Sequence, residues 1–178
     1  MSSRAGNLYA WLGLILVVVV SDQVTKWMVL NTPAFNARAC LDVTVACGQI
    51  KVSPLFDLTM LWNRGISFGT FQSDGIMRWV LVGATSGIAV AFAIWLTRAQ
   101  RWLTALSLSL VIGGAIGNLV DRVRFGAVVD FLDFSGMYFP WVFNIADSAI
   151  TVGAVLLFLD QFLMSRSGPK SETGTSRN

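Results

Sequence analysis

Apolar residues gather into four long stretches of the chain, with polar residues concentrated between them. The stretches cover residues 8–30, 79–96, 102–120 and 141–163, and a polar segment at 21–26 interrupts the first. A helix that crosses a membrane needs about 20 mainly apolar residues, because each residue adds about 1.5 Å of length. The pattern therefore predicts four transmembrane helices, at about 8–30, 77–97, 102–122 and 141–163.

The first stretch has a second interpretation. Its uninterrupted apolar part runs only from residue 8 to residue 20 and follows Arg4, as in the core of a secretory signal peptide. No small-residue cleavage site follows Val20, however, and the helical pattern resumes after Lys26. We therefore expect a membrane helix rather than a cleaved signal peptide.

Residues 31–75, between the first two helices, have a different pattern. Turn-forming residues separate three short β-prone runs, at 43–45, 49–52 and 58–61. The expected fold is therefore an all-α membrane protein of four transmembrane helices with a small extracytoplasmic β-sheet, or cradle, between helices 1 and 2. Cys40 and Cys47 lie in this segment, where either a disulfide across a hairpin or two free thiols would fit.

The composition agrees with a membrane protein and excludes several kinds of chemistry. Hydrophobic residues make up 54% and charged residues 13% of the chain, whereas about 25% of a soluble domain is charged. The chain has no His, which excludes Ser-His-Asp and Cys-His catalysis and His-based metal sites. Glu172 is the only glutamate, so carboxylate chemistry must use Asp. Two cysteines are too few for a four-cysteine zinc site, and we expect no metal and no cofactor.

Basic residues are distributed unevenly among the connecting segments. Arg and Lys predominate before residue 8, at 97–101 and after residue 164, whereas acidic residues predominate in the other connections. The positive-inside rule then places both termini in the cytoplasm and residues 31–75 and 121–140 outside. Residues 1–164 are expected to form one integral-membrane domain, and the Ser-, Gly- and Thr-rich segment 165–178 a disordered cytoplasmic tail.

Some features of the predicted helices are interpreted as structural. Glycine pairs at 83 and 87 and at 113 and 117 place small residues one turn apart, which lets neighbouring helices approach closely. Asp160, near the inner end of the fourth stretch, is expected to meet lipid headgroups or Arg166.

Charged residues close to the apolar stretches are candidates for function, because a charge near hydrocarbon is costly. Asp22 and Lys26 are four residues apart on one helical face, where they form either a helix-end salt bridge or part of a site. Asp130 and Asp147 lie at the same outer level and are the carboxylates least well explained as surface charges. Two neighbouring carboxylates can share a proton, so that one activates water while the other protonates a substrate carbonyl. This is the chemistry of an aspartic peptidase.

Five short motifs lie at or near the outer ends of the predicted helices. They are Asp22-Gln23-x-Thr25-Lys26, Asn63-x-Gly65-x-x-Phe68-Gly69, Gly117-Asn118-x-x-Asp121-Arg122, Val129-Asp130-Phe131 and Phe143-Asn144-x-Ala146-Asp147-Ser148. In this order and spacing they resemble the motifs of bacterial lipoprotein signal peptidases, the signal peptidase II family, over about residues 8–163. Two departures affect the outer sheet and the substrate contacts: segment 33–49 looks longer than usual, and Arg64 and Ile66 stand where small residues are commoner.

The resemblance implies a membrane aspartic endopeptidase that removes the signal peptide from diacylglyceryl-modified prolipoproteins, cutting just before the lipidated cysteine. It implies a catalytic pair, Asp130 and Asp147. It also implies residues around the substrate or the antibiotic globomycin, namely Asn63, Asn118, Arg122 and Asn144. The supporting residues would be Asp22, Lys26, Asp121, Gly65 and Ser148, with Asp121 orienting Arg122 or the adjoining loop.

The resemblance also implies a setting for the protein. We expect a monomer in the bacterial cytoplasmic (inner) membrane, with its active site at the outer face. Its partners would be prolipoprotein substrates and membrane lipid, with globomycin as an inhibitor.

Other functions fit the sequence less well. A proton-coupled membrane transporter would place acids near the bilayer midplane and would show an internal repeat, whereas the informative acids here lie at one face. A structural assembly subunit leaves Asp130, Asp147 and Arg122 unexplained. Nucleic-acid binding is unsupported, because the basic residues are scattered as topology signals. Which of the two aspartates holds the proton stays open.

Overall fold

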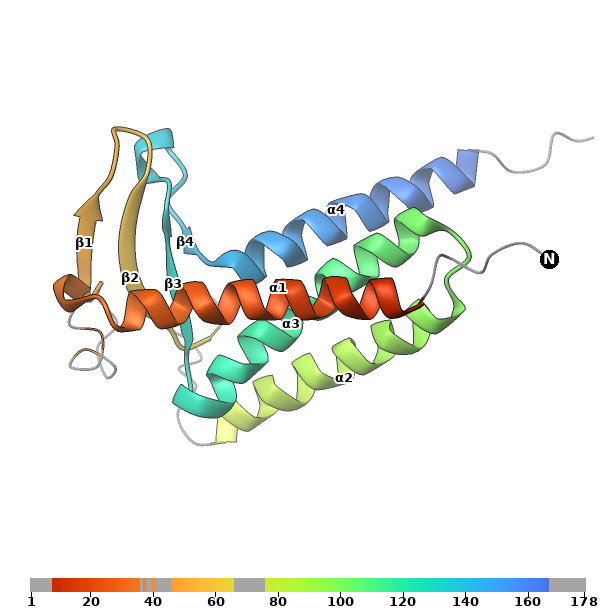
Figure 1. The fold of residues 1–178 in the computed structure, drawn as a ribbon, viewed down its shortest axis with the longest axis horizontal. Helices are drawn as coiled ribbons and strands as arrows, with labels where there is room; N and C mark the ends of the chain where they lie inside the picture. Colours follow the sequence, from red (N-terminus) through yellow and green to blue (C-terminus); the bar gives the residue numbers. More distant parts are fainter. Residues whose placement is uncertain (1–7, 36, 38–39, 41–45, 66–75, 167–178) are drawn as a thin grey trace, which may run out of the picture.

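The computed structural model describes residues 8–35, 37, 40, 46–65 and 76–166 (Figure 1). Within these residues lie four long helices: α1 Leu8–Leu30, α2 Ile76–Arg98, α3 Trp102–Phe125 and α4 Ile145–Arg166. All four are long and apolar enough to cross a membrane, which confirms the predicted four-helix fold. The sheet lies at one end of the bundle, and the start of α1 and the end of α4 both lie toward the other end (Figure 1).

Helix α3 is the buried helix of the bundle, and α1, α2 and α4 each pack against it. Its glycines permit close contacts: a Cβ at Gly114 would collide with the carbonyl oxygen of Ala146 in α4, and a Cβ at Gly117 would lie 2.6 Å from the Asp22 carboxylate in α1. Close packing through this part of α3 is therefore confirmed. The matching prediction for α2 is wrong, because a Cβ at Gly83 or Gly87 would meet no atom of the described chain within 4 Å.

The four-stranded sheet is antiparallel, and its strands run across the direction of the helices (Figure 1). In spatial order the strands are β1 Gly48–Lys51, β2 Asp57–Asn63, β3 Val128–Asp133 and β4 Val142–Phe143. The runs at 49–52 and 58–61 are thus confirmed as strands, and the run at 43–45 lies outside the described residues. The sequence pattern does not predict β3 and β4, so the connection between α3 and α4 contributes half of a sheet that we expected from segment 31–75 alone.

The fourth helix begins at Ile145 rather than at Trp141. Residues 142–143 form β4, which pairs with Leu132 and Asp133 of β3. Asn144 then caps the helix, because its side-chain oxygen accepts a hydrogen bond from the backbone N–H of Asp147 at 2.8 Å. Apolar residues continue across the strand and the helix, so hydropathy alone does not reveal the boundary. The helix continues to Arg166, beyond the predicted end at 163, and the rest of the expected disordered tail lies outside the described residues.

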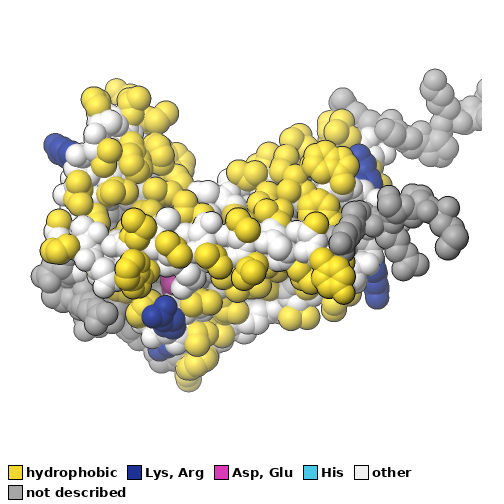
Figure 2. All heavy atoms as spheres, viewed as in Figure 1, with side chains coloured by type: hydrophobic (Ala, Val, Ile, Leu, Met, Phe, Trp, Pro, Cys, Tyr) yellow, Lys and Arg dark blue, Asp and Glu magenta, His cyan; other side chains and the backbone are white. Residues whose placement is uncertain are grey.

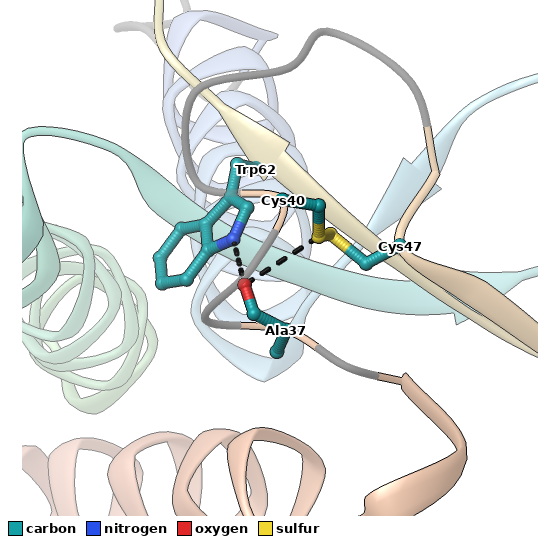
Figure 3. The surroundings of a disulfide bond; sticks show 4 residues. All are labelled: Ala37, Cys40, Cys47 and Trp62. Atoms are coloured by element: carbon teal, nitrogen blue, oxygen red, sulfur yellow. Dashed lines mark hydrogen bonds between the residues drawn. A yellow bond between two sulfur atoms is a disulfide. The ribbon is translucent and has the colours of Figure 1, made fainter.

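A disulfide joins Cys40 to Cys47, whose Cα atoms are 5.7 Å apart (Figure 3). Beside it, the Trp62 indole N–H of β2 donates a hydrogen bond to the carbonyl oxygen of Ala37 at 2.8 Å, and the Cys40 sulfur lies 3.4 Å from the same oxygen. Phe35 and Ala37 are buried in one apolar cluster with Trp62. The segment after α1 is therefore fastened to the sheet, and the two thiols that the sequence left open are paired.

The outer surface of the helices is largely apolar, and Lys and Arg gather toward the two ends of the molecule (Figure 2). Asp160, in the half of α4 far from the sheet, is buried. Its carboxylate pairs with Arg101 at 2.9 Å and accepts a hydrogen bond from the Thr104 hydroxyl at 2.5 Å. The predicted contact with lipid headgroups is therefore wrong, since Asp160 is buried and α3 and the loop before it supply both described contacts. The side chain of Arg166, the other predicted partner, lies outside the described part of the chain.

Candidate active site

Asp130 and Asp147 approach the junction of sheet and bundle from different elements. Asp130 lies in the middle of β3 and is 1% exposed, and Asp147 lies in the first turn of α4. Asn63, at the end of the neighbouring strand β2, donates a hydrogen bond to Asp130 Oδ2 at 3.0 Å. The backbone N–H of Gly65 donates to the Asn63 side-chain oxygen at 3.2 Å, so the turn after β2 holds this amide in place.

Asn144 connects the two carboxylates. Its side-chain Nδ2 donates to Asp130 Oδ1 at 2.7 Å, and its backbone N–H donates to Asp147 Oδ2 at 3.3 Å. Together with the cap described above, this makes a reciprocal capping box in which Asp147 occupies the third helical position. The Ser148 hydroxyl adds a bond to the Asn144 carbonyl oxygen at 2.9 Å. The two carboxylates are thus held by one fully buried residue.

Asn118, in α3, supports the same arrangement from the opposite side. Its Nδ2 donates to Asp147 Oδ1 at 2.7 Å, and its Oδ1 accepts bonds from Lys26 Nζ at 3.0 Å and from Asn144 Nδ2 at 3.2 Å. The amide groups of Asn118 and Asn144 are therefore engaged within the protein. Both side chains are almost completely buried, and we assign them to holding the carboxylates.

Lys26 is the centre of a buried charged network beneath these residues. Its Nζ lies 2.8 Å from both Asp22 and Asp121, and all three side chains are at most 2% exposed. Asp22 accepts a bond from the backbone N–H of Ala146 at 2.9 Å, and Asp121 accepts one from that of Val129 at 3.1 Å. The network therefore holds the backbone of Ala146 and of Val129, which directly precede Asp147 and Asp130 in the chain.

The structure also adds residues that the sequence analysis did not single out. Gln23 Nε2 donates to Asp121 at 3.0 Å and to Asp22 at 3.2 Å. The position of Gln23 in the motif, between Asp22 and Lys26, could have indicated that it belongs to this network. Arg78 of α2 donates through Nε to the carbonyl oxygen of Arg122 at 2.8 Å, and no pattern indicated this contact. The predicted Asp22–Lys26 ion pair is present. Asp121 accepts a hydrogen bond from the backbone N–H of Val129 in β3, whereas Arg122 or the adjoining loop was the expected partner.

Arg122 lies half-buried near the end of α3. Its guanidinium forms no hydrogen bond or ion pair within the described part of the chain, although the carboxylates of Asp147, Asp130 and Asp121 lie close enough to attract its charge. Among the described residues, no group of three or more Cys, His, Asp or Glu is arranged to hold a metal ion. The described part of the site thus brings the carboxylates of Asp130 and Asp147 close to the guanidinium of Arg122.

The electrostatic environment distinguishes the two carboxylates. Burial raises the pKa of Asp130 to about 7, and the negative charge of Asp147 acts in the same direction. The hydrogen bonds from Asn63 and Asn144 oppose this rise, because they stabilise the ionised form. Near neutral pH the carboxyl group of Asp130 can therefore carry a proton.

Comparisons with known proteins identify the family of the chain. A family model described as signal peptidase (SPase) II matches residues 14–163. The lipoprotein signal peptidase of Caulobacter vibrioides is 43% identical over 158 residues, which cover 88% of this chain and 89% of that protein. The one from Burkholderia mallei is 42% identical over 162 residues, covering 89% of this chain and 91% of that protein.

Two solved structures, each described as a bacterial membrane enzyme, have the same fold. The first has a TM-score of 0.79 at 24% identity, and the match covers 98% of this chain and 100% of that structure. The second has a TM-score of 0.73 at 27% identity, and the match covers 90% of this chain and 97% of that structure. The family model spans most of the chain, and the named relatives match it nearly end to end. The chain therefore belongs to the signal peptidase II family and is a membrane peptidase.

Proposed function

We propose that this lipoprotein signal peptidase hydrolyses the peptide bond just before the lipidated cysteine of diacylglyceryl-modified prolipoproteins, with Asp130 and Asp147 as its catalytic pair. The observation that carries the proposal is that Asn144 donates hydrogen bonds to both carboxylates. The raised pKa of Asp130 supports it further, because a working pair needs one proton donor and one base near neutral pH.

The chemistry follows from this division of roles. Asp147 takes a proton from a water molecule, and the water oxygen attacks the scissile carbonyl carbon while Asp130 gives its proton to the carbonyl oxygen. The resulting diol then breaks down: the amine nitrogen takes the proton from Asp147, the C–N bond breaks, and a diol hydroxyl returns a proton to Asp130. One water is consumed, a carboxylic acid and an amine are released, and both aspartates regain their starting states.

The remaining candidate residues divide into two groups. Arg122 is placed to meet substrate, since its guanidinium is unpaired among the described residues and can donate to peptide carbonyl oxygens. The three asparagines, Asn63, Asn118 and Asn144, act as positioning residues, because their amide groups are already bonded within the protein. This revises the expectation that all four contact substrate.

We further propose that the sheet and the site lie at the outer face of the bacterial inner membrane, with both termini in the cytoplasm. The basic residues Arg98 and Arg101 lie at the end of the bundle away from the sheet, as the positive-inside rule requires (Figure 1). Because one chain supplies both carboxylates, we expect an active monomer. Globomycin should compete with substrate for the space near Asn63 and Arg122.

A gel-shift cleavage assay tests the catalytic pair. Purified protein in detergent is incubated with a diacylglyceryl-modified prolipoprotein, beside Asp130→Asn and Asp147→Asn. We expect cleavage by wild type and a loss of at least about 1,000-fold in each variant, because neither the base nor the proton donor can be replaced by an amide.

Asp133→Asn is the matched control for this assay. Asp133 lies in the same strand as Asp130, but its carboxylate bonds to Thr59 and Ser135 instead of the site, so the variant should keep most of its activity. Near-normal turnover by Asp130→Asn or Asp147→Asn would show that the two-carboxylate mechanism is wrong. Failure of the wild type to cut a substrate that another signal peptidase II cuts would refute the proposed cleavage itself.

A further inference from the structure

A cavity of about 470 Å³ opens at the sheet end of α1. Its floor contains Gln23, Lys26 and Asp121, and Arg124 lies among its lining residues. Arg122 and Arg124 are two residues apart in one helix, so their side chains leave its axis about 200° apart. Neither Asp130 nor Asp147 lines the cavity, which is therefore separate from the space where the proposed reaction takes place.

The walls of the cavity are apolar and include aromatic rings. Trp27, Leu30, Trp62 and Phe125 line it, and Trp27 is 65% exposed on the outer surface of α1. Tryptophan is common at the boundary between membrane and water, because its ring is apolar and its N–H stays polar. Figure 2 shows an acidic side chain between apolar and basic groups near the sheet end of the helices. The cavity thus combines a polar floor with apolar walls at the level of the lipid headgroups.

The charges around the cavity balance. Lys26 is paired with both Asp22 and Asp121, which leaves one net negative charge at the floor. Arg124 supplies one positive charge; it packs over the ring of Phe125, 4.9 Å from the ring centroid, and makes no ion pair with any residue that the structure describes. A ligand with one positive and one negative group matches this arrangement better than a ligand with net charge.

The cavity keeps both hydrogen-bond acceptors and hydrogen-bond donors that a ligand could use. Gln23 uses its Nε2 for the buried network, which leaves its Oε1 as an acceptor. Asn31 uses its Nδ2 to bond the carbonyl oxygen of Trp27 at 2.7 Å, which leaves its Oδ1 as a second acceptor. Donors come from the guanidinium of Arg124 and the indole N–H of Trp27.

We propose that this cavity binds the headgroup of a zwitterionic aminophospholipid of the phosphatidylethanolamine class. The phosphate is held by Arg124 and the Trp27 indole N–H, and the ammonium donates to the oxygens of Gln23 and Asn31. The acyl chains lie along the exposed apolar side of α1, where Val24 and Val20 are about half exposed. The site is independent of the catalytic proposal, because it needs neither aspartate of the pair.

Native mass spectrometry of the full-length protein, released from detergent after titration with phosphatidylethanolamine, tests the proposal. We expect one retained lipid, with an apparent affinity that Arg124→Gln lowers about tenfold or more, because the variant cannot form the charge-assisted hydrogen bond to the phosphate. Arg124→Lys should keep most of the binding. Arg98→Gln is the matched control, since Arg98 ends α2 at the opposite end of the bundle, and it should bind like wild type.

Two results would overturn the proposal. One is equal retention by wild type and Arg124→Gln, with circular dichroism confirming that the variant is folded. The other is binding of phosphatidylglycerol or phosphatidylcholine as tight as that of phosphatidylethanolamine, because the first carries net charge and the second has no amine protons to donate. Neither measurement uses peptidase activity, so the outcome is separate from that of the cleavage assay.

Discussion

At the scale of single residues, Asp130 combines burial with a nearby like charge, and both disfavour its ionised form. Its pKa of about 7 means that it loses its proton within the physiological range. Asn63 moderates this effect, because its amide donates to the carboxylate at 3.0 Å and stabilises the charged state. The fraction of enzyme in which Asp130 is protonated therefore depends on the burial of Asp130, on the charge of Asp147 and on the hydrogen bonds from the two asparagines, Asn63 and Asn144.

A pH profile tests this relation. If Asp130 is the proton donor, kcat/KM should fall as pH rises through about 7, because the donor disappears on ionisation. Asn63→Ala removes a hydrogen bond to the ionised form, so the pKa of Asp130 should rise and the falling limb should move to higher pH. Cleavage rates between pH 5 and 9 measure both.

The midpoint of that limb is informative even if the Asn63→Ala variant cleaves slowly. Weaker binding of substrate by the variant would lower the rate at every pH without moving the midpoint. Ser148→Ala should leave the midpoint in place, because the Ser148 hydroxyl bonds to a backbone oxygen. A downward shift in Asn63→Ala would contradict the assigned role of Asp130.

At the scale of elements, the start of α4 sets the position of Asp147. The capping box with Asn144 and the bond from Ala146 to Asp22 hold the first turn of the helix at both its side chains and its backbone. Gly114 lets α3 approach this turn, because a Cβ there would overlap the Ala146 carbonyl oxygen. The spacing of two helices thus determines where one carboxylate lies.

Gly114→Ala should therefore damage both stability and activity. The added methyl must push α4 away from α3, and overpacking of this kind costs about 1–3 kcal/mol. Thermal unfolding in detergent should show a lower midpoint, and the cleavage rate should fall because Asp147 moves with the helix. Gly83→Ala is the matched control, since that Cβ meets no described atom within 4 Å and alanine favours a helix; an equal loss in both variants would rule out the clash with Ala146 as the cause.

At the scale of the whole molecule, a membrane bundle carries a sheet built from two separate connections. The disulfide and the buried Phe35 and Ala37 fasten the segment after α1 onto that sheet. Disulfides persist in oxidising compartments outside the cytoplasm. The covalent link therefore agrees with a sheet at the outer face of the membrane.

Thiol labelling of the protein in intact cells tests this placement. Cys40 and Cys47 are the only cysteines of the chain, so a bulky maleimide should add no mass until a reductant is supplied, and should then add two labels. Labelling without reductant would contradict the pairing. Labelling that needs permeabilised cells even after reduction would contradict the outer location.

The sequence predicted the features that depend on local pattern. Long apolar runs indicated the four helices, and isolated acids beside them drew attention to Asp130 and Asp147. It did not predict β4, because its apolar residues lead into α4 without a change of pattern. It did not predict β3, because that short strand pairs with β2, about 70 residues earlier in the chain, and no local pattern indicates such a pairing. The pairing of Lys26 with Asp22 follows from their spacing of four residues in one helix. The contacts of Lys26 with Asp121 and Asn118 join α1 to α3, more than 90 residues apart in the sequence, so no local pattern predicts them.

The buried network around Lys26 has a consequence for how the protein can evolve. Replacing Lys26 alone leaves Asp22 and Asp121 buried without a counter-ion, and removing one partner of a buried pair costs about 3–5 kcal/mol. Replacing either aspartate alone leaves the ammonium poorly compensated, so every single-step path out of the triad passes through a damaged protein. The three positions should therefore be inherited as one unit, and lineages that lose one of them should have lost or rebuilt all three.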